Sequence, residues 1–153
     1  MDLTTAGRVA FDTTACIYYL ECATTDPRCA VLLPVVRAAE ARTIDLVVST
    51  VTVTELLTGP LRAGNQKAEA AVRLFVGLLC TVVPVDLAVA ERAAAIRADH
   101  GFRTPDALIC ATAVLTAAVI VGNDPKWKRM GSLVTYVHID DLVASCRDRP
   151  GCR

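Results

Sequence analysis

The sequence has few aromatic residues and no net charge. Aromatic residues make up 5% of the chain and hydrophobic residues 54%, so a core must be built from Ala, Val, Leu and Ile. Such a core favours alternating helices and buried strands over an aromatic-rich sandwich. Sixteen basic residues balance sixteen acidic residues. Any nucleic-acid-binding surface must therefore be local, and a bound metal ion would add positive charge that this balance omits.

The seven cysteines include no Cys-x-x-Cys pair. Their number is odd, and several of them, such as Cys80 and Cys110, stand in apolar runs. This pattern favours buried thiols in a reducing compartment over a disulfide framework or a zinc site. We interpret Cys16 and Cys110 as residues of helix cores.

Targeting and membrane-spanning segments are also missing from the sequence. No basic N-terminal region precedes an apolar stretch, and no apolar run reaches about 18 residues without a charge or a breaker. We therefore expect no signal peptide, no membrane contact and a cytoplasmic location.

The chain is long enough, at 153 residues, for one domain with its own core. We expect this domain over residues 1–145 and a loose polar tail over 146–153. Hydrophobic patterns predict strands and helices in alternation, which implies a mainly parallel sheet of four to five strands with helices on both faces. The predicted strands are 8–12, 44–49, 81–85, 119–122 and 133–139, and the predicted helices are 14–22, 28–42, 50–57, 67–79, 86–99, 104–117 and a last short helix from Asp140 or Asp141.

Two of these helices depend on particular local signals. The β-branched alternation of residues 50–57 favours a strand, but a strand from 44 to 57 would be unusually long, so we predict a helix that ends at Gly59-Pro60. Residues 61–66 are then a polar connector, which could act as a mobile lid. Thr104 is the predicted N-cap of the later helix, and Pro105 its first residue.

Four acidic residues stand where predicted strands end or predicted helices begin: Asp12, Glu55, Asp106 and Asp124. Each has an ordinary explanation as a cap, an exposed helix residue or a turn residue. In parallel α/β sheets, however, sites form outside the carboxyl ends of the strands, where Asp12, Glu55 and Asp124 would meet. Asp106 would join them only if the segment 86–103 leads the chain back to that edge.

A shared site of four carboxylates predicts a divalent cation. Mg²⁺ and Mn²⁺ prefer carboxylate oxygens and waters, and four carboxylates without a cation would repel one another and raise their pKa values. We assign direct or water-bridged metal contacts to Asp12 and Asp124. Glu55 and Asp106 would bind outer waters, and one of the two would act as general base.

The same acids lie in four motifs whose order and spacing, from about residue 8 to residue 143, resemble PIN domains, specifically the VapC-type toxins of bacterial toxin–antitoxin pairs. The motifs are Phe11-Asp12-Thr13, Thr54-Glu55-Leu56-Leu57, Thr104-Pro105-Asp106-Ala107 and Val121-Gly122-Asn123-Asp124. The resemblance implies a three-layer α/β/α fold, a divalent ion (Mg²⁺ or Mn²⁺) held by Asp12, Glu55, Asp106 and Asp124, and endoribonuclease activity on RNA. It also implies a homodimer and a small antitoxin that fills the active-site groove.

The sequence departs from the family pattern at two positions. The family often has Thr or Ser two residues before the last acid, where this chain has Gly122, and often has Phe after that acid, where this chain has Trp127. If the hydroxyl positions water or an acid, this chain must manage without it, and Asn123 or Thr13 are the candidates to replace it.

Candidate substrate contacts surround the acids. The densest basic stretch follows Asp124, and its Trp127 could either stack on a base or pack on the core. A surface ion pair is the alternative role for the arginine beside Asp106. The two histidines show no partner spacing. The candidates are Thr13, Arg103, Asn123, Lys126, Lys128 and Arg129.

Two other functions compete with the nuclease. A phosphoryl-transfer protein of the receiver or phosphatase kind would need an adjacent acid pair or an Asp-x-Asp motif at the first strand, where this chain has Asp12-Thr13-Thr14. A PIN-like binding or scaffold module that has lost catalysis is the non-enzyme alternative. The four acids argue against that module, and Gly122 leaves it open.

Overall fold

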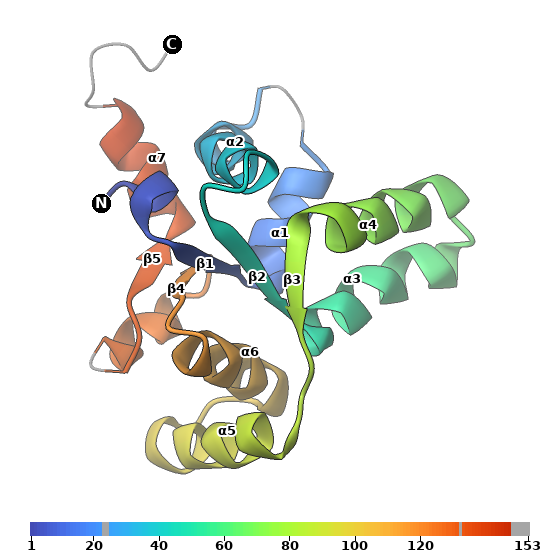
Figure 1. The fold of residues 1–153 in the computed structure, drawn as a ribbon. Helices are drawn as coiled ribbons and strands as arrows, with labels where there is room; N and C mark the ends of the chain where they lie inside the picture. Colours follow the sequence, from blue (N-terminus) through green and yellow to red (C-terminus); the bar gives the residue numbers. More distant parts are fainter. Residues whose placement is uncertain (23–24, 132, 148–153) are drawn as a thin grey trace.

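The computed structural model describes residues 1–22, 25–131 and 133–147. Five parallel strands form one sheet in the order β3-β2-β1-β4-β5, which confirms the predicted parallel sheet (Figure 1). The strand that precedes Pro84 lies at one edge of this sheet. The strands are β1 (Arg8–Phe11), β2 (Asp45–Ser49), β3 (Cys80–Val83), β4 (Val119–Gly122) and β5 (Tyr136–His138).

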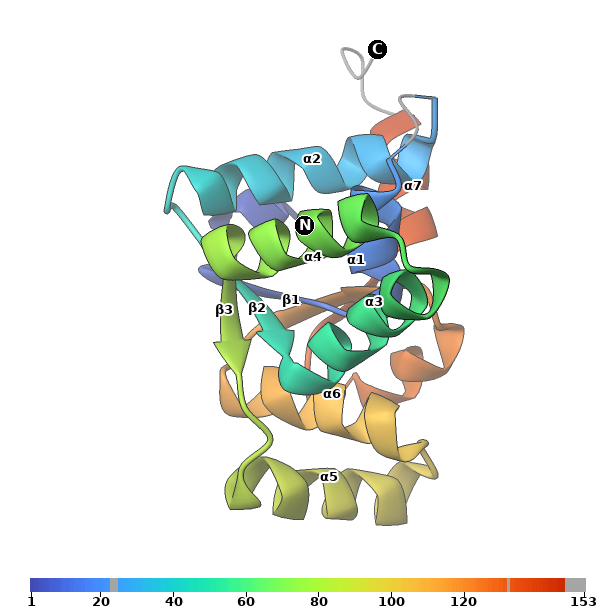
Figure 2. The same cartoon turned by 90° about the vertical axis from the view of Figure 1, so that its right-hand side faces the viewer.

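Helices cover both faces of the sheet, as the α/β/α fold requires. The helices are α1 (Thr13–Leu20), α2 (Pro27–Glu40), α3 (Thr50–Ala63), α4 (Gln66–Leu79), α5 (Leu87–His100), α6 (Thr104–Leu115) and α7 (Ile139–Arg147), with two short 3₁₀ turns, η1 (Leu3–Thr5) and η2 (Pro125–Met130). Figure 2 shows α5 and α6 stacked below the sheet, and α2 and α4 above it. None of the described helices is long and apolar enough to cross a membrane.

The core consists of two clusters, one on each face of the sheet. Successive residues of a strand point to opposite faces, so Val9 and Phe11 join the cluster under α1, α2 and α4, whereas Ala10 joins the cluster under α5 and α6. In the same strand register, Ala10 lies opposite Val47 and Ile120, which also face α5 and α6. This register aligns the carboxyl ends of β1, β2 and β4 at one edge.

The helix that begins after β2 is longer than predicted. It passes through Gly59 and Pro60 and ends at Ala63, where Gly64 adopts a left-handed conformation (φ 61°) and its N–H donates to the Leu61 carbonyl. Pro60 removes one backbone donor and crowds the carbonyl four residues earlier, but the helix continues past it, and the left-handed Gly64 supplies the C-cap. The predicted connector over 61–66 is therefore wrong.

Most other boundaries differ from the prediction by one or two residues, and three differences have a visible cause. Arg103, not Thr104, occupies the N-cap position of α6 and makes no side-chain cap hydrogen bond. The same helix ends at Leu115, because Ala117 has a positive φ of 53°. The last strand begins only at Tyr136, since the N–H groups of Leu133 and Val134 donate to the Met130 carbonyl and so are not available to the sheet.

The cysteines are only partly as expected. Cys16 and Cys110 are fully buried in their helices, as predicted. Cys22 and Cys29, however, form a disulfide that joins the end of α1 to the start of α2, which contradicts the expectation of free thiols at these two positions. Their Cα atoms lie 5.5 Å apart because the end of α1 lies beside the start of α2, and sequence spacing alone does not show this arrangement.

The C-terminal helix includes two residues of the predicted tail. Cys146, which is also disulfide-bonded, and Arg147 are the last residues of α7. The rest of the predicted tail, 148–153, lies outside the described residues.

Candidate functional site

The structure brings the four predicted acids into one pocket of about 460 Å³ at the carboxyl edge of the sheet. The pocket is lined by Asp12, Thr13, Thr14, Glu55, Thr58, Asp106, Ile109, Asp124 and Trp127. Asp12 follows β1, Glu55 lies in the second turn of α3, and Asp124 follows β4. Asp106 reaches the same edge because it lies in the first turn of α6, which begins there.

Asp12 is almost completely buried, with 6% of its surface exposed. Its Oδ1 accepts a hydrogen bond from the Ala15 N–H at 2.6 Å and so caps α1, and its Oδ2 accepts one from the Asn123 N–H at 3.3 Å. Burial raises the pKa of Asp12 to about 6, against the lowering effect of these backbone donors. The capping role considered from the sequence is therefore real, and it coexists with a carboxylate that is costly to ionise in this protein.

Gly122 provides the space that the Asp12 carboxylate occupies. A Cβ built on Gly122 would lie 2.7 Å from Asp12 Cγ and even closer to Oδ2. A Ser or Thr at position 122 would therefore clash with Asp12 as it stands. This close approach gives a steric reason for the absence of the hydroxyl residue that the family often has there.

The other three acids face the same hollow. The Thr13 hydroxyl donates a short hydrogen bond to Glu55 Oε2, which ties α1 to α3. Burial raises the pKa of Asp106, and the nearby charges of Asp124 and Glu55 raise it further. Asp124 accepts a hydrogen bond from the Lys126 N–H at 2.9 Å and caps η2, as its turn position suggested.

Two of the basic candidates lie close enough to the acids to affect them. The positive charges of Arg103 and Lys126 partly offset the rise in the pKa of Asp106. Lys128, in contrast, forms an ion pair with Asp141 of α7 at 2.9 Å. Arg129 is exposed on η2. Arg103 and Lys126 are therefore the better placed to contact an anion at this pocket.

Trp127 is a core residue rather than a free stacking platform. Only 2% of its surface is exposed. Its ring meets Phe102 edge to face, with centroids 6.1 Å apart, and packs against Tyr136 at 5.9 Å. Of the two roles considered for Trp127, the structure supports packing on the core, from where it lines the pocket.

The donor set suits a hydrated cation better than a closed ligand cage. Within the described ranges, no three His, Cys, Asp or Glu side chains converge closely enough to form a ready metal-binding group. The four carboxylates nevertheless share one pocket, and repulsion between them contributes to the raised pKa of Asp106. Mg²⁺ commonly keeps several waters and contacts only one or two carboxylates directly, so these residues fit such an ion.

His138, which no sequence pattern singled out, also contributes to this region. Its Nε2 lies 3.0 Å from the carbonyl oxygen of Asn123. Asn123 donates its backbone N–H to Asp12 and directly precedes Asp124, and both of these acids line the pocket. No residue spacing points to this contact. The only signal is the pairing of Gly122 with His138 across β4 and β5, which depends on the sheet register.

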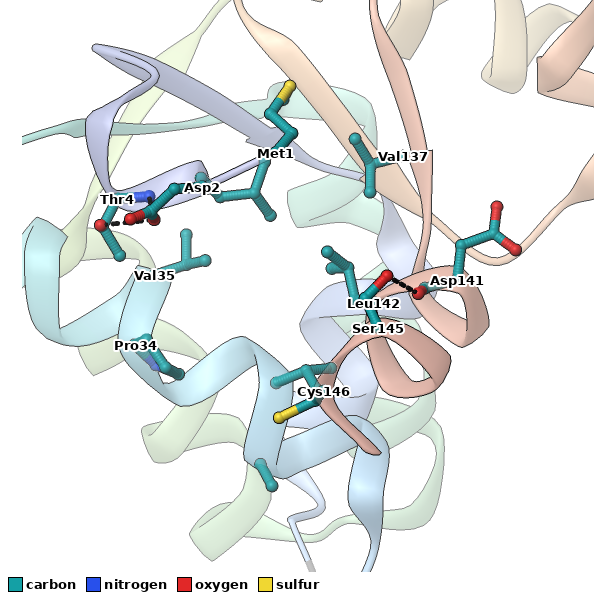
Figure 3. A pocket seen from close by; sticks show the side chains of 13 residues that line it. Met1, Asp2, Thr4, Pro34, Val35, Val137, Asp141, Leu142, Ser145 and Cys146 are labelled. Atoms are coloured by element: carbon teal, nitrogen blue, oxygen red, sulfur yellow. Dashed lines mark hydrogen bonds between the residues drawn. The ribbon is translucent and has the colours of Figure 1, made fainter. Parts of the chain in front are cut away.

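A second pocket, of about 380 Å³, lies between the N-terminal turn, α2 and α7 (Figure 3). Apolar side chains such as Val35, Val137 and Leu142 line much of it. It holds only two acids, Asp2 and Asp141, and Asp2 is engaged by the N–H and hydroxyl of Thr4. This pocket offers no gathering of carboxylates comparable to that around Asp12.

Comparisons with known proteins agree with the fold. A family model described as "PIN domain" matches residues 9–133. A search of curated proteins finds no match. A VapBC2 structure from Rickettsia felis, bound to a promoter DNA fragment, matches with a TM-score of 0.68 at 14% identity, over 86% of this chain and 98% of that chain.

Two other solved structures are similarly close. DNA-bound VapBC from Salmonella typhimurium matches with a TM-score of 0.66 at 18% identity, over 86% of this chain and 98% of that one. FitAcB from Neisseria gonorrhoeae matches with a TM-score of 0.65 at 22% identity, over 84% and 96%. At such identities, these structures establish a shared fold.

Proposed function

The chain belongs to the PIN domain family, and from this premise we propose that it is a metal-dependent endoribonuclease that acts as the toxin of a toxin–antitoxin pair. The nuclease domain would span residues 1–145, as expected from the sequence, together with Cys146 and Arg147, which complete α7.

The observation that carries the proposal is the meeting of four carboxylates from four separate segments in one pocket. A fold does not imply a function, but a set of groups that converges on one point does indicate a chemistry. Burying Asp12 with a raised pKa is costly, and a bound cation would remove that cost.

Mg²⁺ or Mn²⁺ is the cofactor that this donor set fits. When bound, such an ion supplies an activated water and offsets charge on the scissile phosphate. Asp12 and Asp124 would hold it directly or through water, and Glu55 and Asp106 through outer waters. Asp106 is our candidate for general base, since a raised pKa makes a carboxylate a better proton acceptor, whereas Glu55 already accepts from Thr13.

RNA would approach across the basic side chains beside the pocket. Arg103 and Lys126 would contact phosphates, with Arg129 further along η2. Thr13 completes the proposed substrate contacts at the pocket itself, whereas Asn123 is a weak candidate because it does not line the pocket and donates to Asp12 and Tyr18. Lys128 is the weakest candidate of the set, because it is already paired with Asp141.

The antitoxin would fill the active-site groove, and an apolar groove beside the pocket would receive its apolar side chains. The groove lies between α1, α3 and α4, includes Leu56 and Val72, and shares Glu55 with the acid pocket. Leu74 and Leu78 on the neighbouring face of α4 are 60% and 66% exposed. The VapBC structures of similar fold support a protein partner for such a surface.

A homodimer in the cytoplasm completes the proposal, on the strength of the resemblance to VapC-type toxins. The Cys22–Cys29 disulfide argues against this location, because cytoplasmic thiols are normally kept reduced.

The second candidate function is a PIN-like binding or scaffold module that has lost catalysis and works through its antitoxin complex. Gly122 favours it, because the hydroxyl that the family often has at this position does not fit beside Asp12. The two candidates differ in whether the acid pocket cleaves RNA.

One assay separates them. Purified protein is incubated with structured and single-stranded RNA in Mg²⁺ or Mn²⁺ and then in EDTA, and compared with Asp12→Ala and Asp86→Ala. Asp86 is a matched control, since it caps α5 as Asp12 caps α1 but lies outside the pocket. We expect cleavage by the wild type and Asp86→Ala, and none by Asp12→Ala or in EDTA.

Cleavage that survives EDTA, or equal behaviour of the wild type and Asp12→Ala, would show that the metal-dependent nuclease proposal is wrong. The toxin role has a separate test. Expression should arrest growth, and a co-expressed neighbouring gene should relieve the arrest. Arrest that persists with Asp12→Ala would contradict the toxin mechanism.

A further inference from the structure

His138 makes two hydrogen bonds behind the acid pocket, one with each ring nitrogen. Its Nε2 lies 3.0 Å from the Asn123 carbonyl oxygen, and its Nδ1 lies 3.2 Å from the backbone nitrogen of Asp140. A backbone N–H can only donate, so Nδ1 must be the acceptor. The ring proton therefore sits on Nε2, which donates it to the Asn123 carbonyl.

Asn123 links the two acids that we expect to hold the ion. Its N–H donates to Asp12 Oδ2 at 3.3 Å, and the next residue is Asp124. The carbonyl held by His138 belongs to the peptide that joins Asn123 to Asp124. A hydrogen bond to this carbonyl fixes the backbone torsion of Asn123, and with it the position of Asp124 relative to Asp12.

A closed circuit of side chains holds His138 in place. The Asn123 side-chain amide donates to the Tyr18 hydroxyl at 3.4 Å, and the Arg28 guanidinium lies 5.0 Å from the centroid of the Tyr18 ring. Arg28 Nε donates to Asp140 Oδ1 at 2.9 Å, and the Asp140 N–H donates to His138 Nδ1, which closes the circuit. The circuit thus ties α1, α2 and the start of α7 to the loop between the two acids.

A purely structural role would need only half of this arrangement. His138 precedes α7, and acceptance by Nδ1 from the Asp140 N–H is what a helix cap does. The bond from Nε2 to Asn123 adds nothing to that cap. The two roles therefore reside on different ring nitrogens and can be separated by substitution.

We propose that His138 is a positioning residue of the acid pocket, which orients Asn123 so that Asp12 and Asp124 face one cation. Groups that orient metal ligands without touching the metal commonly have this effect. The inference rests on the proposed function for the identity of the cation, but the positioning itself can be measured without one.

Three variants isolate this role. His138→Asn keeps a short side-chain oxygen for the cap of α7 but does not reach Asn123. His138→Gln places an amide donor near the position of Nε2 and should restore the bond. His100→Asn removes the other histidine, which also packs beside an aromatic ring at 6.3 Å but lies at the end of α5.

Amide hydrogen exchange of the metal-free protein is the first measurement. Asp12 accepts from the N–H groups of Ala15 and Asn123, so Ala15 is an internal control. We expect His138→Asn to speed exchange at Asn123 by about tenfold or more and to leave Ala15 unchanged, and the other two variants to match the wild type. Unchanged exchange at Asn123, or failure of His138→Gln to restore it, would overturn the inference.

Mn²⁺ affinity by titration calorimetry is the second measurement. We expect His138→Asn to bind Mn²⁺ about 10- to 100-fold more weakly than the wild type, His138→Gln and His100→Asn. If exchange changes as expected but the wild type binds no Mn²⁺, the proposed function is wrong and the positioning of Asn123 stands. If the wild type binds Mn²⁺ and His138→Asn binds it equally well, the proposed function stands and the inference is wrong.

Discussion

At the scale of single residues, Asp12 combines a helix cap with a destabilising charge. Its pKa of about 6, against an ordinary value of 3.8, means that the folded protein holds the proton more tightly than the unfolded chain. Stability from this group is therefore fully present below pH 3.8 and is lost as the pH rises through 6. At pH 7 the ionised carboxylate costs roughly 3 kcal/mol at most.

Asp12→Asn should therefore stabilise the metal-free protein at neutral pH. The Asn carbonyl can still accept from the Ala15 N–H and the buried charge is gone, but the Asn123 N–H loses its acceptor at every pH. We therefore expect the free energy of unfolding in EDTA, relative to the wild type, to be higher by roughly 1–3 kcal/mol at pH 7.5 than near pH 4. Urea denaturation at both pH values measures it. A difference that does not depend on pH would contradict the burial argument.

Gly122→Ala tests the contact beside Asp12. The added methyl group must displace the carboxylate, so we expect a loss of roughly 1–3 kcal/mol in unfolding free energy and weaker Mn²⁺ binding. Gly77→Ala is the control, since nothing lies within 4 Å of a Cβ at this position of α4. In a helix interior this control should stabilise by about 0.5–1 kcal/mol. Equal effects of the two substitutions would mean that Gly122 is not a steric requirement.

At the scale of helices and strands, the sequence predicted elements well where one signal dominated. Residues 119–122 form β4 within the predicted bounds, because a short apolar run between breakers has few alternatives. The predicted end of α3 was wrong. Gly59-Pro60 is a strong local signal for a helix end, but the packing of α3 on α4 overrides it. The Cys22–Cys29 disulfide was missed because it depends on the angle between two helices.

The proposed role of the exposed face of α4 in antitoxin binding can be tested by substitution. Leu74 is 60% exposed and lines a neighbouring hollow together with Leu78, whereas Leu115, at the end of α6, is 51% exposed away from it. We expect Leu74→Asp to prevent a co-expressed antitoxin from relieving growth arrest, because a charge would be buried in the complex. RNA cleavage should be unchanged, and Leu115→Asp should behave as the wild type. Relief of arrest in Leu74→Asp would exclude this face.

At the scale of the whole molecule, the sequence predicted the gathering of the acids but not the contacts around them. Asp12, Glu55 and Asp124 follow strands whose carboxyl ends must align in a parallel sheet. The position of Asp106 at this edge depends on the path of α5 and the start of α6, which local sequence patterns do not specify. The contact of His138 with Asn123 and the close approach of Gly122 to Asp12 follow from the strand register, which a single sequence does not encode in any local pattern.

The balanced charge of the molecule makes RNA binding a local property with a shallow salt dependence. If Arg103, Lys126 and Arg129 contact phosphates, the slope of log K against log salt should be about −2, at roughly 0.7 for each neutralised phosphate on a single strand. The slope is measured by fluorescence anisotropy with single-stranded RNA, in the Asp12→Asn background so that the RNA is not cut. Arg103→Gln and Lys126→Gln should each make the slope shallower by about 0.7. Lys128→Gln is the matched control, since its ammonium already pairs with Asp141. A slope much steeper than this, or an equal effect of Lys128→Gln, would place the RNA on a broader surface than the rim of the acid pocket.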